Sequence, residues 1–531
     1  MKRMLALLLS AAGLLLCACG GVAVPAATAT PTDGTVRTEV TVKGVSTLEV
    51  YKDTITLTDN PAGDALCTVT YPALALGEAE AAAYPALARA FGALNAQSAA
   101  NSGESYTRLL AAADADMQRR AAAPEAADGT DGESGAEFEM FYRYDDLTLL
   151  RADSRAVSIL YSMTTFSGGV HGNYSFYSTN LDTASGRSLL LSEVVTDMAK
   201  LRTVLENKLR EMYPKADFTG LEDALNGYFA DPASFTWTLD YEGLSFFFSP
   251  GELAAFDDGK IICTLRFSEL SGLCEEYYTS APTDYVVPFT DGRVLNLDIN
   301  ADGVSDEVSV EKVYSDKADE IEKLVITVGG REYVANTPML DCTLYLVNVS
   351  SARYYLYVSA QNLTGYGYVS VYKLDRSGAS LVGMVYDSSL DAAGYADTLP
   401  GAPLLTSPGS FKLGTRIRYL GTLTGIKTYS VGLDGMPATN DAYYTLSGAA
   451  PLTLKSQLVT ATIDAAGSGT FAAATINPGT SMSFLRSDGA GAVDMVTDTG
   501  VYCRLYVSGS PGAQYVNGMP AADLFDGIGA D

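Results

Sequence analysis

Histidine is almost missing from this chain of 531 residues, which has only His171. A Ser-His-acid triad would have to use that residue, and no Gly-x-Ser-x-Gly elbow accompanies it. A catalytic zinc site would have a single imidazole and no close pair of cysteines. Carboxylate pairs that cleave glycosidic bonds remain open, because their separation is a three-dimensional quantity. The sequence therefore disfavours catalysis, and a cell-wall hydrolase that uses carboxylates is the enzymatic alternative.

Positive charge is also scarce. The chain has 35 Lys and Arg residues against 63 Asp and Glu residues, which gives a formal net charge of −28. Because phosphate binding needs a basic surface, we expect no nucleic acid partner. A basic protein would be attracted to this charge, and the alternative is that the charge serves solubility alone.

Long apolar runs are missing from the chain after its amino-terminal stretch. No segment in that later part approaches the roughly 20 apolar residues of a transmembrane helix. Residues 2–16 pair a positive start with an apolar stretch, as signal peptides do. Leu16-Cys17-Ala18-Cys19 then fits the lipobox of bacterial lipoproteins, with Cys19 as the acylated residue. An ordinary secretory peptide that is cut nearby is the alternative. We predict a signal peptide over 1–18, a flexible linker over 19–39, and an extracytoplasmic chain that a lipid anchors to the bacterial cell membrane.

Cysteine is sparse, and its spacing is wide. The five cysteines after Cys19 lack the close pairs of a zinc site or a redox motif, and their odd number leaves at least one unpaired. We interpret them mainly as small buried apolar residues. Cys263 and Cys274 are the only two near enough in sequence to suggest a disulfide.

Glycine and aromatic residues are concentrated in one stretch, 167–186, which contains the histidine. Strand alternation places Tyr174 on one face and Tyr177 on the other, with a turn after residue 182. His171 either faces a ligand or hydrogen-bonds a backbone carbonyl to close the glycine turn. The candidate binding residues are His171, Asn173, Tyr174 and Tyr177.

Local patterns predict the elements around this stretch. Residues 77–118 have a helical pattern, and Leu201, Leu205 and Leu209 predict the buried stripe of a second helix with Asp197 as its N-cap. Residues 235–248 are typical of a hairpin.

Four segments, taken together and in this order, resemble the RsiV-like extracellular domain family: residues 168–173, the turn 180–186, the Phe-Ser-Pro corner at 248–250 and the segment 267–270. The resemblance covers about 138–275. Residues 40–137 are similar to the α+β subdomain that accompanies this unit in RsiV and PdaC-type proteins.

In RsiV the extracellular domain binds lysozyme, so the resemblance implies lysozyme as a possible partner. PdaC-type enzymes owe their activity to a separate metal-dependent domain with several histidines, which one histidine cannot supply. Family membership alone does not establish a function.

Short strands separated by Gly, Asp and Ser turns predict a β-rich domain over 285–455 and an SH3-like β-barrel over 456–531. The first contains oxygen-bearing side chains at calcium-loop spacing, although position twelve is Ser309 and not Glu. A solvated turn is the alternative to a Ca²⁺ site there. The candidate metal ligands are Asp298, Asn300, Asp302 and Asp306.

The sequence as a whole predicts an α+β fold: an α+β RsiV-like region, a mainly β domain and a small barrel. We expect a non-catalytic, lipid-anchored binding protein for an envelope ligand, lysozyme or peptidoglycan. An architectural or sensing lipoprotein of unknown ligand is the alternative.

Overall fold

A computed structural model describes residues 44–61, 64–122, 139–169, 171–289, 293–316, 320–350, 352–390, 403–448, 450–465 and 472–528. The predicted signal peptide, the linker and Cys19 lie outside these ranges. Strands account for 48% of the structure and helices are few, which confirms an α+β chain with a mainly β domain.

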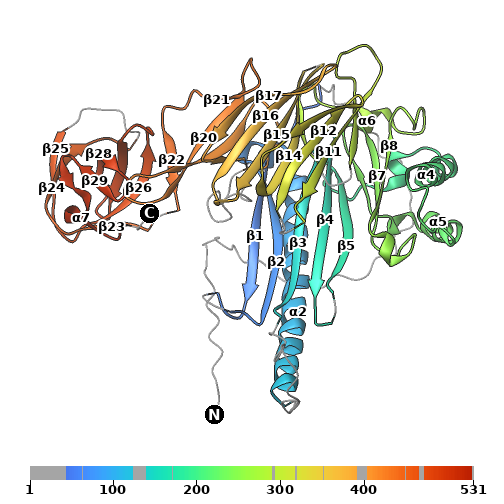
Figure 1. Ribbon diagram of the computed structural model, residues 1–531, viewed down its shortest axis with the longest axis horizontal. Coiled ribbons are helices and arrows are strands. Elements are labelled where there is room, and N and C mark those ends of the chain that lie inside the picture. The colour runs from blue at the N-terminus through green and yellow to red at the C-terminus, as the bar shows by residue number, and fades with distance from the viewer. Residues whose placement is uncertain are drawn as a thin grey trace. The chain divides into compact units, whose positions relative to one another are not determined.

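The first sheet has five strands in the order β1-β2-β3-β4-β5. All neighbouring strands are antiparallel except β2 and β3, which are parallel. The long helix α2 comes between these two strands in the sequence. Helix α2 lies along one face of the sheet (Figure 1). Its Leu87 and Phe91 are buried there. The helix predicted over 77–118 is therefore confirmed. The bounds are β1 (Val50–Thr58), β2 (Cys67–Leu76), α1 (Glu78–Ala83), α2 (Pro85–Ala122), β3 (Phe141–Ala152), β4 (Ala156–Phe166) and β5 (Asn173–Asp182).

No helix within the described ranges combines the length and the apolar character that a membrane crossing requires.

A three-stranded sheet, β6-β7-β8, packs on the other face of β4 and β5. Side chains make the junction: the Leu239 amide donates to Ser158 Oγ over 2.9 Å, and Asn180 Nδ2 donates to the Trp237 carbonyl over 2.8 Å. The predicted hairpin over 235–248 is confirmed by β6 and β7. The bounds are β6 (Trp237–Leu239), β7 (Gly243–Phe248), β8 (Ile261–Arg266), and the 3-10 turns η1 (Pro232–Ser234) and η2 (Phe256–Asp258).

Helix α4 (Met198–Met212), which the sequence predicts, covers this small sheet. Its leucines at 201, 205 and 209 are fully buried, and the carboxylate of Asp197 accepts the amide of Lys200 over 3.0 Å. Both the apolar stripe and the N-cap are confirmed. The other helices of this region are α3 (Leu191–Val194), α5 (Leu221–Ala230) and α6 (Glu276–Thr279).

The cysteines behave mainly as small apolar side chains. Cys67, Cys263 and Cys503 are fully buried, and burial raises the pKa of the Cys263 thiol to about 12. Cys263 and Cys274 are free thiols that pack in the same core, so a disulfide between them is not formed.

The second sheet has nine antiparallel strands, with the path β10-β11-β12-β14-β15-β16-β17 and with β9 and β13 at its sides. Strands β15 and β16 form a tyrosine-rich hairpin, in which Tyr357 pairs with Val371. The bounds are β9 (Tyr285–Phe289), β10 (Val294–Leu297), β11 (Asp306–Tyr314), β12 (Ile321–Val328), β13 (Arg331–Ala335), β14 (Met339–Ser350), β15 (Arg353–Asn362), β16 (Gly367–Asp375) and β17 (Gly378–Tyr386).

The third sheet joins strands from 388–454 to the last strands of the chain in one hydrogen-bonded network. Strand β22 bridges them, because Ile426 pairs with Thr445 and Thr445 pairs with Arg486. The boundary that the sequence places between 455 and 456 therefore falls inside one sheet and one core. The SH3-like barrel stays a prediction.

The bounds in this third sheet are β18 (Ser388–Ser389), β19 (Phe411–Ile417), β20 (Leu423–Val431), β21 (Pro437–Ala438), β22 (Tyr444–Ser447), β23 (Leu452–Leu454), β24 (Leu458–Thr462), β25 (Ala472–Ile476), β26 (Ser481–Ser487), β27 (Ala492–Thr497), β28 (Tyr502–Ser510), β29 (Ala513–Val516), β30 (Met519–Pro520), α7 (Ala521–Leu524) and β31 (Phe525–Asp526).

Candidate functional site

The glycine stretch connects β4 to β5 at one end of the five-stranded sheet. Gly168 and Gly169 have φ of +88° and +118°, the left-handed region that other residues rarely adopt. At Gly172 a Cβ would lie 3.1 Å from the carbonyl oxygen of Thr165 and 3.3 Å from the hydroxyl of Tyr142. The glycines therefore let the chain reverse tightly and bring Tyr142 against it.

His171 lies at the surface of this turn. Its Nδ1 is 3.0 Å from the carbonyl oxygen of Gly172, and its ring stacks on Phe256, with centroids 5.5 Å apart. Phe256 comes from the loop between β7 and β8, and 49% of it is exposed. The imidazole thus contacts a backbone carbonyl and still faces solvent. Its described neighbours are an aromatic ring and a peptide group.

Three tyrosines extend this surface along one sheet face. Tyr144 pairs with Thr164 and Thr164 pairs with Tyr174, so both rings project from the same side. Tyr142 stacks on Tyr144 with centroids 4.7 Å apart, and Lys260 Nζ lies 5.8 Å from the centre of the Tyr174 ring. We call the following set the aromatic end surface: Tyr142, Tyr144, His171, Tyr174 and Phe256.

The ring faces of this surface suit two kinds of ligand. Aromatic rings bind sugar rings or apolar side chains by stacking, and tyrosine adds a polar hydroxyl. The exposed imidazole of His171 adds a ring nitrogen that can form a hydrogen bond. The arrangement is equipped for binding.

The four candidate binding residues do not all share this surface. Asn173 is exposed beside it. Tyr177 points to the opposite face, where its ring stacks on Tyr161 at 4.5 Å and its hydroxyl lies 3.4 Å from a carboxylate oxygen of Asp145. Burial, with a further contribution from Asp145, raises the pKa of Tyr177. Tyr177 therefore belongs to the packing under α2.

Beneath the same helix, Arg143 pairs with Asp145 and donates to Ser105 Oγ of α2 over 2.8 Å. These contacts hold the sheet to the helix on the side opposite the aromatic end surface.

The candidate metal ligands lie in the turn between β10 and β11. Both carboxylate oxygens of Asp298 accept backbone amides, from Asp302 over 3.0 Å and from Gly303 over 2.8 Å. Asn300 and Asp302 accept amides within the same turn. Asp306 begins β11, outside these bonds. Within the ranges that the structure describes, no three His, Cys, Asp or Glu side chains are grouped so that they could share a metal ion.

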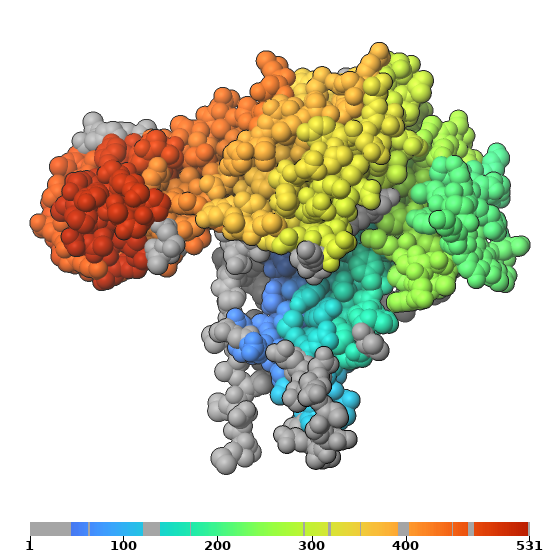
Figure 2. Space-filling view, viewed as in Figure 1, coloured from blue at the N-terminus to red at the C-terminus, as the bar shows by residue number. Residues whose placement is uncertain are grey.

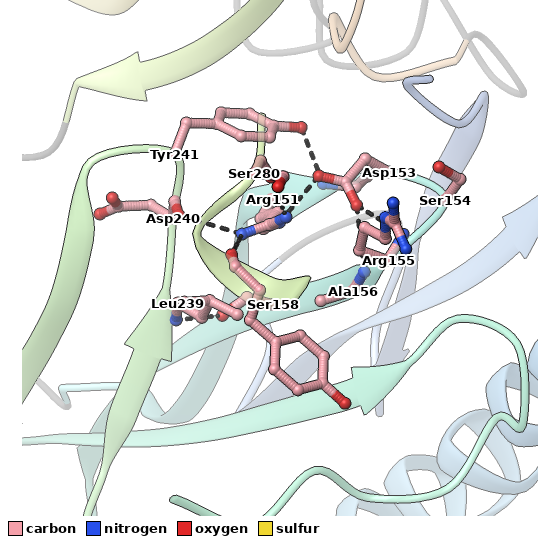
Figure 3. Close-up of polar contacts among 12 residues, drawn as sticks. Arg151, Asp153, Ser154, Arg155, Ala156, Ser158, Leu239, Asp240, Tyr241 and Ser280 are labelled. Atoms are coloured by element: carbon pink, nitrogen blue, oxygen red, sulfur yellow. Dashed lines mark hydrogen bonds and ion pairs between the residues drawn. The ribbon is translucent and has the colours of Figure 1, made fainter. Parts of the chain in front are cut away.

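Sequence reasoning missed a buried polar network around Arg151 (Figure 3). Arg151 Nε donates to Asp153 over 2.8 Å, and both side chains have no exposed surface. Its other nitrogens donate to the carbonyl groups of Tyr278 (2.6 Å), Ser280 (2.8 Å) and Asp240 (3.3 Å). The network ties the β3–β4 turn to the β6–β7 hairpin and to the end of α6.

A second buried pair continues from this network. Asp240 accepts Arg293 over 2.5 Å and also accepts the amides of Glu242 and Gly243. The Glu242 carboxylate accepts the amide of Asn296, and burial raises its pKa to about 8. These side chains are buried, and their N–H groups donate to backbone carbonyl groups and to carboxylates. The two clusters therefore hold the β3–β4 turn and the β6–β7 hairpin to β10.

No family model matches the sequence, and no curated protein is significantly similar to it. Two solved structures of DUF3298 family proteins are similar to parts of it. One, from Bacteroides fragilis, is 15% identical and covers 43% of this chain and 94% of its own, with a TM-score of 0.29. The other, from Pseudomonas aeruginosa, is 13% identical and covers 45% and 99%, with a TM-score of 0.30. The similarity is thus to a domain family of unknown function.

Proposed function

We propose that this chain is a lipid-anchored extracytoplasmic protein that binds a cell-envelope ligand, lysozyme or peptidoglycan, and does not catalyse a reaction. The observation that carries the proposal is the aromatic end surface. It gathers rings from β3, β5 and the β7–β8 loop at one sheet end, where Phe256 (49%) and Tyr144 (37%) are exposed and Tyr142 and Tyr174 are half-buried. The residues that resemble the RsiV-like domain include the glycine stretch of this surface, which supports binding in the same region.

The two ligands would be bound by different interactions. A glycan would stack its sugar rings on Tyr144 and Phe256. A basic muramidase would in addition be drawn by the net charge of −28, and this long-range attraction weakens with salt. Binding that persists at ordinary ionic strength therefore distinguishes a built surface from nonspecific attraction.

A retention assay with the chain from residue 20 onward tests the proposal. The probes are lysozyme on a resin and insoluble peptidoglycan, each at about 0.15 M salt, where the screening length is about 8 Å. We expect one of them to retain the protein. Tyr144→Ala with Phe256→Ala should reduce retention at least about tenfold, because truncating a central aromatic contact typically costs 2 kcal/mol or more.

Tyr386→Ala is the matched control, because Tyr386 is 70% exposed and lies on β17. It should leave retention unchanged. Equal retention of the double variant and the wild-type chain, or no retention of either on both probes, would contradict the proposal.

The lipid anchor has a separate test. Metabolic labelling with a fatty-acid analogue should mark the wild-type chain and fail to mark Cys19→Ser. A chain isolated with its first eighteen residues uncut would overturn this part.

Calcium at 298–306 remains a proposal that rests on the spacing of the side-chain oxygens. Hydrogen bonds from backbone amides hold the oxygens of Asp298, Asn300 and Asp302 within one turn. Calorimetric titration with Ca²⁺ should give a binding signal that Asp298→Asn with Asp302→Asn removes. Identical titrations of the two proteins would exclude the site.

A further inference from the structure

The outer face of the third sheet carries positive charge in an otherwise acidic protein. The register across six strands aligns Gly414, Ile426, Thr445, Arg486, Asp494 and Arg504 in one row. Residues two positions away in a strand share a face, so Lys412 and Arg416 of β19 lie beside the first of these. Arg418 follows directly after β19. We call this set of cations the basic row: Lys412, Arg416, Arg418, Arg486 and Arg504.

The opposite face of the same strands is the hydrophobic core. Ile417, Leu446 and Val493 occupy the alternate positions and are buried there. The cations at 412, 416, 418 and 486 keep part of their surface exposed, whereas Arg504 and Asp494 are buried, at 7% and 1%. Part of the segment that contains β19 to β22, drawn in orange, lies at the surface in Figure 2.

The charge of this face differs in sign from that of the chain. Among the residues of this face that the structure describes, five cations accompany one carboxylate, Asp494, which gives +4 against −28 for the whole protein. Asp387 and Asp441 lie at its edges, where their residues hydrogen-bond the backbones of Arg416 and Thr428. The face stays positive, at +2, when both are counted. Because charges beyond about 8 to 10 Å are screened at ordinary salt, a ligand on this face encounters mainly the local cations.

Aromatic rings hold the guanidinium groups in place. Arg416 and Arg418 both lie over Tyr366, at 4.7 and 5.4 Å from its ring centre. Arg486 and Arg504 both lie over Tyr443, at 4.8 and 5.2 Å. Stacked guanidinium groups keep their N–H donors in a plane that suits phosphate and carboxylate oxygens.

The two pairs of arginines differ in whether a carboxylate neutralises part of their charge. Asp494 accepts Arg486 over 2.7 Å and Arg504 over 2.6 Å, and its side chain is 1% exposed. One carboxylate cannot neutralise two guanidinium groups, so this pair retains one positive charge. Threonines lie between the two pairs, with Thr445 exposed and Thr428 half-buried, and each offers a hydroxyl.

We propose that the basic row binds a linear polyanion, an envelope polymer that carries phosphate groups along its chain. Its partly exposed cations extend from β19 across β20 and β22 to β26, and strands lie about 4.8 Å apart, so they span roughly 14 Å. A row of this kind fits an extended chain of charges better than one compact anion. The binding is independent of the aromatic end surface, which has a different location and different chemistry.

Binding of inorganic polyphosphate of defined length to the chain from residue 20 onward tests the inference. We expect affinity to fall with salt by roughly 0.7 to 0.9 logarithmic units per decade of salt for each cation engaged. Arg416→Gln with Arg418→Gln should lower this slope by roughly 1.4 to 1.8 and weaken binding on the order of tenfold at 0.1 M salt.

Arg119→Gln with Lys200→Gln is the matched control, since it removes the same charge from side chains that are 76% and 71% exposed elsewhere. It should leave the slope unchanged. Thermal unfolding of both variants checks that they fold, and Lys412→Gln, which lies on the same row, provides a second loss of one charge.

Three results would overturn the inference. Equal slopes for the wild-type chain and the Arg416/Arg418 variant would remove the basic row from the site. Binding to vesicles of anionic phospholipid with none to polyphosphate would indicate a membrane-facing surface. Self-association that the same variant abolishes would indicate that the row pairs with the acidic surface of a second copy. Retention on lysozyme or peptidoglycan is measured separately, so failure of either proposal leaves the other standing.

Discussion

Arg151 and Asp153 form an ion pair in which neither side chain has any exposed surface, with Nε and Oδ2 2.8 Å apart. The pair lies at the end of β3, just after a register shift between Leu149 and Arg151. Desolvation of both charges is offset because Arg151 also donates to three carbonyl groups, and Asp153 also accepts the amides of Arg155 and Ala156. The pair is therefore one part of a saturated network.

Arg151→Met should destabilise the protein by about 3 to 5 kcal/mol, because it leaves the Asp153 carboxylate and three carbonyl groups without their main donor in a buried site. Denaturant unfolding measures the change. Lys373→Met is the control: Lys373 pairs with Asp375 at a site where its side chain is 51% exposed, and such pairs contribute about 0 to 1 kcal/mol. A similar small loss for both variants would contradict the role of the buried network.

Gly186→Ala should destabilise the protein strongly. Gly186 has a φ of +66°, and a Cβ there would overlap the carbonyl group of Ala86 at the start of α2. The substitution adds backbone strain of about 1 kcal/mol or more to this overlap, so the turn after β5 must move away from the helix. Gly220→Ala is the control, because nothing lies within 4 Å of its added Cβ. Melting temperatures of the two variants should differ clearly, and equal values would show that the turn yields without cost.

Tyr177→Phe should leave ligand binding unchanged, although Tyr177 is among the residues that the sequence proposes for binding. The ring would keep its stacking on Tyr161 and lose only a 3.4 Å contact to Asp145, which Arg143 still engages. We expect a loss of stability of about 1 kcal/mol. The retention assay and an unfolding curve on the same protein measure both effects. Reduced retention with unchanged stability would return Tyr177 to the binding surface.

Local sequence patterns predicted the elements whose partners lie nearby in sequence. The leucine stripe of α4, its N-cap at Asp197 and the β6–β7 hairpin all depend on spacings of a few residues, and all three are confirmed. Strand alternation likewise separated Tyr174 from Tyr177. The structure adds that α2 covers the face on which Tyr177 lies, which the sequence does not show.

The missed features depend on contacts between distant residues. Arg151 donates to residues 89, 127 and 129 positions away, and the strand sequence around it does not reveal those carbonyl groups. The one available signal was that Arg151 and Asp153 directly follow the apolar residues Leu149 and Leu150. The basic row was hidden in the same way, since its cations come from separate strands and a net charge of −28 averages them out. The average charge led us to expect no nucleic acid partner, whereas the strand register shows where cations gather on one sheet.

Glu242→Gln should change how stability depends on pH. Burial raises the pKa of Glu242 from its ordinary 4.5 to about 8, with Asp240 adding to the rise and Arg293 and Arg266 opposing it. Between these two values the folded protein binds a proton that the unfolded chain releases, so the contribution of Glu242 is fully present below about pH 4.5 and is lost as pH rises through 8.

A glutamine at 242 does not titrate and can still accept the amide of Asn296. The free energy of unfolding of Glu242→Gln, minus that of the wild-type chain, should therefore increase from pH 5 to pH 8, by at most about 1.4 kcal/mol per pH unit. Denaturant unfolding at four or five pH values measures this difference, in which the other carboxylates cancel. A difference that is flat with pH would mean that Glu242 is ionised in the folded protein, with Arg293 and Arg266 outweighing the cost of its burial.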